Sequence, residues 1–238
     1  MLLMKRKLRS LCIISAFLAT FSMMAQDSIV IHKDSVKVRN QKYGIRLGGD
    51  LSKLARTAFE SGYSGFEING DLRFSKRFYA AAEIGLEDRD WDKDQLVANI
   101  NGSYIKLGGD FNAYQNWLGM NNAIFAGLRY GFATFSEELK EYPVYTTNTI
   151  FSAVVRDNSK NFSGLNASWV EFIFGVKTEI YNNLFLSVNV QLKRKLNEKK
   201  PDNFDNLIIP GYNRTYDYSE FGVGYGYTLS YLIPILKR

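Results

Sequence analysis

The stretch Ser219–Ile233, SEFGVGYGYTLSYLI, decides the fold of this 238-residue chain. One set of alternate positions is apolar or aromatic from Phe221 to Ile233, and the set between them is glycine or polar from Glu220 to Ser230. A period of two over this length predicts a β-strand with one apolar face and one polar or small face. A strand this long needs a partner on both edges. Pairing with the first strand of the chain would supply one, so the sequence predicts a closed barrel.

Seven earlier segments repeat the alternation. The connections after the second, fourth and sixth strands are short, whereas those after the first, third, fifth and seventh are long. Short turns at one end and long loops at the other are typical of outer-membrane barrels. The expected fold class is therefore all-β, an eight-stranded antiparallel up-and-down transmembrane β-barrel over 42–238. The earlier strands are predicted at 42–51, 64–74, 77–87, 102–114, 123–135, 168–180 and 184–196, and the long loops at 52–63, 88–101, 136–167 and 197–218.

The N-terminus has the composition of a secretory signal peptide. Four basic residues precede an apolar run from Leu11 to Met24, which is too short to span a membrane as a helix. We expect a signal peptide at 1–25 and a periplasmic tail at 26–41. Four of the 30 basic residues lie in the leader, so its removal leaves 26 basic against 24 acidic residues, a net charge of +2. This balance gives no case for nucleic-acid binding.

The polar face of the predicted strands carries charges of both signs. An eight-stranded barrel has room inside for side chains alone, and charges sealed there must pair. Strand glycines, among them Gly127 and Gly224, would leave space for long side chains from opposite strands. The expected arrangement is a salt-bridge plug, with a polar solute pathway as the alternative. The predicted interior residues are Arg46, Asp50, Glu67, Asp71, Arg73, Glu83, Lys106, Asp110, Arg129, Glu171, Lys177 and Glu179, with Lys193 on the same face.

Aromatic residues cluster near both ends of the predicted strands. Girdles of aromatic side chains at the two membrane interfaces are expected of such barrels, although strands are enriched in aromatics in general. The predicted girdle residues are Tyr43, Phe74, Phe78, Trp117, Phe132, Trp169, Tyr181 and Tyr231.

The segments Tyr43–Lys53 and Gly65–Asp71, together with the strand pattern from Tyr43 to Ile233, carry a family resemblance. The chain resembles the small eight-stranded barrels related to outer-membrane proteins A and X, and more narrowly barrel proteins of Bacteroidota. The resemblance implies an outer-membrane location and contact with the barrel-assembly machinery. One departure is the C-terminus, because such barrels often end in an aromatic residue and this chain ends in Leu236-Lys237-Arg238.

Enzymatic chemistry finds little support. The single histidine, His32, lies in the predicted tail, and the single cysteine, Cys12, lies in the predicted leader. A nucleophile on the strands would therefore lack a histidine base within hydrogen-bond reach. The sequence predicts no catalytic residue, no metal site and no cofactor.

We therefore expect function to reside in the loops 136–167 and 197–218, as adhesion, recognition or membrane integrity. Tyr142, Tyr145, Arg156 and Tyr216 are candidate contact residues for an extracellular ligand. Outer-membrane lipid and lipopolysaccharide are the expected surroundings. Two alternatives remain: a narrow solute channel in the same barrel, and a soluble periplasmic lipid-binding barrel of the calycin type, which would turn its apolar faces inward.

Overall fold

The computed structural model describes residues 42–93, 96–113, 122–144, 154–156, 159–216 and 218–237. The predicted leader and tail, Trp117 and Tyr145 lie outside these residues. Eight long strands make up most of the described chain. They are β1 (Lys42–Asp50), β2 (Tyr63–Arg73), β3 (Phe78–Lys93), β4 (Leu96–Asn112), β5 (Ala123–Val144), β7 (Lys160–Tyr181), β8 (Leu184–Glu198) and β11 (Phe221–Lys237).

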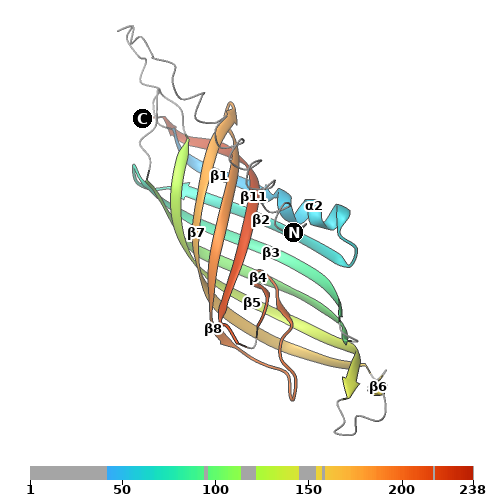
Figure 1. Cartoon of the computed structure of the whole chain (residues 1–238). Coiled ribbons are helices and arrows are strands. Elements are labelled where there is room, and N and C mark those ends of the chain that lie inside the picture. Colours follow the sequence, from blue (N-terminus) through green and yellow to red (C-terminus); the bar gives the residue numbers. More distant parts are fainter. Residues whose placement is uncertain are drawn as a thin grey trace, which may run out of the picture. The chain divides into compact units, whose positions relative to one another are not determined.

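The eight strands close into a ring in which every neighbour is antiparallel (Figure 1). The last strand closes it as predicted: β11 pairs with β8 along one edge and with β1 along the other, from Lys42 opposite Lys237 to Asp50 opposite Thr228. Pro234 lies opposite Gly44 at a bulge in the β1–β11 ladder, the kind of position at which a strand tolerates proline. The predicted fold, an eight-stranded antiparallel up-and-down barrel, is confirmed.

Connections after β2 and β7 are tight turns at one end of the barrel, here called the short-turn end. The opposite, long-loop end differs from the prediction because several strands are longer than expected. The predicted loop 88–101 is mostly strand: β3 runs to Lys93 and β4 begins at Leu96. In the same way β5 reaches Val144 and β7 begins at Lys160, so much of 136–167 is paired, with the short strand β6 (Val154–Arg156) added beside β5.

These strands extend because polar side chains continue the alternation beyond the apolar segment. Asp88 on β3 accepts hydrogen bonds from Asn99 and Asn101 on β4, at 2.8 and 2.9 Å. Their neighbour Trp91 is buried on the other face. A charged outward face is expected of a sheet whose outer side contacts water. The same charges, considered in the sequence alone, predict a solvated loop. We call the parts of β3, β4, β5 and β7 that extend beyond the predicted strands the wall extension; they are residues 88–93, 96–101, 136–144 and 160–167.

Two further elements occupy predicted loops at the long-loop end. The segment 52–63 contains a helix, α2 (Leu51–Phe59), whose N-terminus is capped by Asp50: its carboxylate accepts a hydrogen bond from the Ser52 N–H at 2.7 Å. The segment 197–218 contains the small hairpin β9 (Ile208–Ile209) and β10 (Asn213–Arg214). Among the described residues, no helix is long and apolar enough to cross a membrane.

The hairpin β9–β10 packs into the mouth of the barrel. Ile208, Ile209 and Tyr212 are almost fully buried against an apolar cluster from the inner faces of β3, β4, β5 and β7. The barrel interior therefore has two parts: an apolar core at the long-loop end, and a charged region between that core and the short-turn end. The apolar cluster includes Trp91, Ala98, Ile100, Tyr104, Ala133, Phe135, Leu139, Leu165, Ala167 and Trp169.

Candidate functional site

The charged interior of the barrel is the candidate site. Between the apolar core and the short-turn end, alternation along the strands places most charged side chains on the inner face and most aliphatic side chains on the outer face. Asp71, Glu83 and Glu179 are partly buried there. Nine of the predicted interior residues are less than a tenth exposed: Arg46, Asp50, Glu67, Arg73, Lys106, Asp110, Arg129, Glu171 and Lys177.

Lys106 is the centre of the largest ion-pair network. Its ammonium lies 2.9 Å from a carboxylate oxygen of Glu83, 3.4 Å from Glu67 and 3.7 Å from Glu171. These carboxylates come from β3, β2 and β7, so one side chain on β4 connects four strands across the interior. Tyr104 donates a hydrogen bond to Glu67 at 2.5 Å, which engages that carboxylate a second time.

The network continues on both sides of Lys106. Arg129 lies 3.3 Å from Glu83 and 2.8 Å from Asp110, and it also donates to the carbonyl of Gly109 at 3.1 Å. On the other side Lys193 lies 3.4 Å from Glu171 and donates to the carbonyl of Gly211 at 2.6 Å. Buried charges of both signs are thus held in reciprocal contacts, which is the condition for retaining them inside a protein.

A second group lies nearer the short-turn end. Asp71 accepts from Arg46 and from Lys177, both at 2.6 Å, and the Arg46 guanidinium lies 4.7 Å from the ring centroid of Tyr79. Arg73 donates to the carbonyls of Ser75 and Lys76 at 3.1 and 2.7 Å and so stabilises the β2–β3 turn. Glu179 accepts from the N–H of Asn183 in the β7–β8 turn.

The predicted girdle residues fall into three groups. Phe74, Phe78, Phe132, Tyr181 and Tyr231 stand on the outside, between 39% and 76% exposed. Tyr43 is partly buried, with the Arg73 guanidinium 4.8 Å from its ring centroid. Trp169 is a wrong prediction. It is fully buried and donates to Glu171 at 2.7 Å, because it shares the inward parity of Glu171 along β7.

Glycines on the inner face give the long side chains their room. A Cβ at Gly131 would lie 2.3 Å from the Trp169 ring, and one at Gly85 would lie 2.3 Å from the Tyr104 ring. A Cβ at Gly127 would be similarly close to Asp110, and one at Gly224 would lie 2.7 Å from Gln191 and 3.0 Å from Lys193. A methyl group at these positions would displace the residues that form the network.

Little free space remains between the two groups of ion pairs. A cavity of about 50 Å³, lined in part by Asp71, Asp110, Arg129 and Lys177, lies between the two groups of ion pairs. That volume holds roughly one or two water molecules at about 30 Å³ each. Within the part of the chain that the structure describes, no group of three or more histidine, cysteine or acidic side chains is placed to hold a metal ion.

A family model described as Domain of unknown function (DUF6048) matches residues 4–238. The chain belongs to this family. No curated protein among those compared matches it. Among solved structures, the DUF6048 chain is similar to the crystal structure of Ail, the attachment invasion locus protein of Yersinia pestis. The two share 7% identity with a TM-score of 0.41, over 81% of this chain and 98% of that one.

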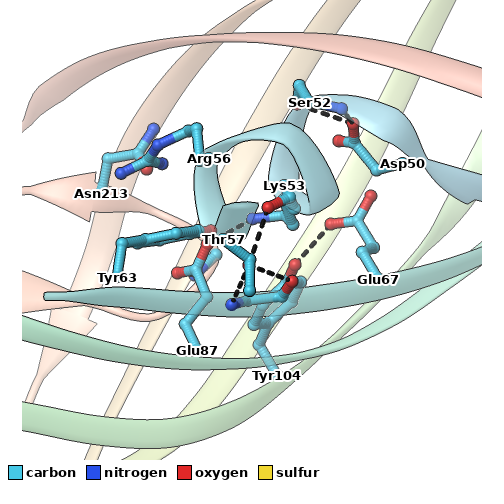
Figure 2. A network of polar contacts seen from close by, with 12 residues as sticks. Asp50, Ser52, Lys53, Arg56, Thr57, Tyr63, Glu67, Glu87, Tyr104 and Asn213 are labelled. Atoms are coloured by element: carbon cyan, nitrogen blue, oxygen red, sulfur yellow. Dashed lines mark hydrogen bonds and ion pairs between the residues drawn. The ribbon is translucent and has the colours of Figure 1, made fainter. Parts of the chain in front are cut away.

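The barrel interior also contains residues that were not among the predicted interior residues. Lys53 on α2 pairs with Glu87 on β3, which also accepts from Tyr63 at 3.0 Å and from the N–H of Gly211 at 2.8 Å (Figure 2). Glu87 has the same parity as Glu83, and this signal was present in the sequence. Lys53 lay in a predicted loop, so nothing in its local pattern placed it near a strand.

Proposed function

We propose that this chain is an integral outer-membrane barrel with a closed polar interior, and that its role lies at the cell surface. The observation that carries the proposal is a belt of exposed apolar side chains on the outer faces of the strands. In a water-soluble barrel these positions would be polar, whereas in a bilayer they contact lipid. The belt includes Leu47, Phe66, Ile68, Leu72, Ile84, Leu86, Ile105, Leu107, Leu128, Tyr130, Phe172, Phe174, Val176, Val188, Val190, Leu192, Val223 and Tyr225.

The height of the belt fits a bilayer. On β7 the outward apolar positions run from Val170 to Ile180. That distance is about 33 Å along a strand, or about 25 Å along the axis of a barrel with the usual strand tilt, which equals the apolar band of outer-membrane barrels. Exposed aromatic residues flank the belt, with Phe74 and Tyr181 at the short-turn end and Phe132 at the long-loop end.

The same arrangement argues against the soluble lipid-binding alternative. A calycin-type barrel turns apolar side chains toward an internal ligand, but here charged side chains such as Lys106 and Glu171 face inward and are almost completely buried. The interior also offers little support for a solute channel. Ion pairs cross it from strand to strand, and the hairpin β9–β10 fills its mouth.

The wall extension is the part of the barrel that would stand above the lipid, and we assign surface recognition to it. Its outward side chains are polar or charged, as in the Asp88–Asn99–Asn101 contacts. Lipopolysaccharide would surround its base, and the barrel-assembly machinery would insert the chain. The proposal assigns no catalytic step to any residue.

Cell fractionation with gel mobility before and after boiling tests the location. We expect the protein to sediment with outer membranes and to shift on heating; a periplasmic protein that is soluble without detergent would overturn the proposal. Single-channel recording tests the closed interior, for which we expect no steady conductance.

Orientation is tested separately with single cysteines. Asn99→Cys lies on the wall extension, and the matched variant Ser75→Cys lies in the β2–β3 turn. A membrane-impermeant thiol reagent should label the first on intact cells and leave the second unlabelled until the cells are opened. The reverse pattern would place the wall extension in the periplasm.

A further inference from the structure

The barrel wall has a gap in its strand pairing at the long-loop end. The strand β1 ends at Asp50, opposite Thr228 on β11, and its last partner on β2 is Ile68. Beyond these positions both neighbours continue. Residues 63–67 of β2 pair with β3 alone, and residues 221–227 of β11 pair with β8 alone. Over this stretch, within the described residues, no backbone ladder connects β2 to β11.

The helix α2 fills this gap. It begins directly after β1 and contacts both β2 and β11. The hydroxyl of Thr57 accepts from the N–H of Gly65 on the β2 edge at 2.8 Å (Figure 2). Its single proton is shared between the carbonyls of Gly65 at 3.0 Å and of Lys53, one turn earlier on α2, at 2.9 Å. On the other edge the bond comes from the hairpin and not from α2: Asn213 of β10 donates to the carbonyl of Val223 on β11 at 3.5 Å. Side chains therefore close the wall here, where elsewhere backbone ladders do.

The helix turns its apolar side outward. Leu51, Leu54 and Phe59 are 38%, 42% and 90% exposed, and with Ala55 and Ala58 they form one stripe at helical spacing. Lys53 and Thr57 face the barrel instead. Leu54 of the stripe lines one surface hollow with Phe66 of the apolar belt, and α2 contacts both β2 and β11, so the stripe continues the proposed lipid-facing surface across the gap.

A cavity of about 210 Å³ lies beneath α2, and its lining includes residues of both the apolar belt and the interior. Its outer lining includes Val223 and Tyr225, which are 75% and 59% exposed on the belt. Its inner lining includes Lys106 and Lys193, which are 2% exposed. Gly224 lies between the two outer residues on the inner face, where Gln191 and Lys193 lie against it. The volume corresponds to roughly seven water molecules at about 30 Å³ each.

We propose that α2 is a lateral gate and that the cavity beneath it binds the phosphate-bearing head group of a membrane lipid. This inference rests on the proposed location in the outer membrane. The gate opens when Thr57 releases the β2 edge, because α2 is then free to move away from β11 as well. The head group passes between α2 and β11 while the acyl chains stay in the bilayer.

The charges around the cavity explain the choice of head group. Four cationic side chains line it, from Lys53, Arg56, Lys106 and Lys193, against two carboxylates. One of these, Asp50, is already bonded to the N-terminus of α2. Carboxylates outside the cavity lining position three of these cations: Glu87 pairs with Lys53, Glu171 with Lys193 and Glu60 with Arg56. A phosphate offers acceptors to several cations at once.

Site-specific photocrosslinking tests the proposal. A diazirine side chain of about methionine's length replaces Gln191, which lines the cavity, or its neighbour Val190, which is 58% exposed on the belt. The full-length protein is reconstituted in vesicles of galactosyl diacylglycerol containing about a tenth phosphatidylglycerol, and adducts are identified by mass spectrometry. Thr57→Val removes the hydroxyl that contacts Gly65 with little change of shape, and Thr57→Ser keeps the hydroxyl.

The probe at Val190 should label both lipids in proportion to their abundance, whereas the probe at Gln191 should enrich phosphatidylglycerol at least threefold. Thr57→Val should raise the yield at Gln191 severalfold, and Thr57→Ser should leave it unchanged. Labelling at Val190 without any at Gln191 overturns the gate and leaves the membrane location standing. Equal lipid ratios at the two sites overturn the phosphate assignment, and a yield independent of Thr57 overturns the route. Labelling at neither site overturns the membrane location itself.

Discussion

Glu137 offers a quantitative test of burial in the part of the barrel interior that lies above the apolar belt. It is fully buried on the inner face of β5, where Ile100 and Phe162 are its partners on the adjacent strands. Burial raises the pKa of Glu137 from its ordinary value of 4.5 to about 7, and the nearby backbone N–H of Leu207 offsets part of the effect. Replacement by glutamine keeps the shape and the acceptor oxygen but removes the charge.

The raised pKa sets the sign of the pH dependence. Below about pH 4.5 both the folded and the unfolded chain hold the proton, so burial of Glu137 is least costly there. As the pH rises from about 4.5 to about 7, the unfolded chain has released the proton and the folded chain keeps it, so the free energy of unfolding falls. The loss is complete above about pH 7. A difference of about 2.5 pH units corresponds to about 3 kcal/mol, as an order of magnitude.

Urea unfolding in detergent micelles at about pH 5 and about pH 8 measures the effect, provided that the transition is two-state and reversible. The gain in stability of Glu137→Gln over the natural chain should be about 2 to 3 kcal/mol larger at the higher pH. Glu138→Gln, one residue along on the outward face, is the control and should show no such difference. A gain from Glu137→Gln that is the same at both pH values would refute the reasoning.

Three further predictions concern separate parts of the barrel. Lys106→Met leaves three carboxylates without their shared cation and should lower the free energy of unfolding in urea by about 3 to 5 kcal/mol. The matched variant Arg194→Met removes an exposed cation that is paired with Glu220, and it should lower the free energy of unfolding by less than about 1 kcal/mol. Leu128→Arg, in the middle of the apolar belt, should cost about 2 to 4 kcal/mol of stability in lipid vesicles. The control Ser136→Arg, above the belt, should cost about 1 kcal/mol or less. Equal losses would contradict the position of the belt. Ile209→Ala opens a cavity beneath the hairpin and should cost about 2 to 5 kcal/mol in the same unfolding assay, and a neutral result would show that the hairpin does not pack in the barrel mouth.

The sequence predicted the barrel because a period of two is a local signal that every strand carries. It also placed the charged side chains on one face, since residues such as Glu67 and Lys106 keep strict parity with their neighbours. Parity would have placed Trp169 inside as well. The girdle prediction for Trp169 rests on its position near the end of the strand, and that criterion ignores the direction of the side chain.

The elements at the long-loop end were harder to predict. The apolar stripe of α2 at helical spacing and the cap residue Asp50 before it were visible, but the segment was short and lay between two strands. The burial of Ile208 and Ile209 depends on tertiary packing, because a two-residue strand has no periodicity of its own. The partner of Lys53 is Glu87, 34 positions along the chain, and no local pattern connects them.

The position of Lys106 has a consequence for how the barrel is assembled. Its three carboxylates come from β2, β3 and β7, so its charge is balanced in full when strands from both halves of the chain have come together. A partly closed sheet would present unpaired ions toward the hydrocarbon, where each is costly. In the proposed outer-membrane location, insertion into the bilayer and closure of the ring would therefore be coupled, and the ion pairs would select against the release of an incomplete barrel into the membrane.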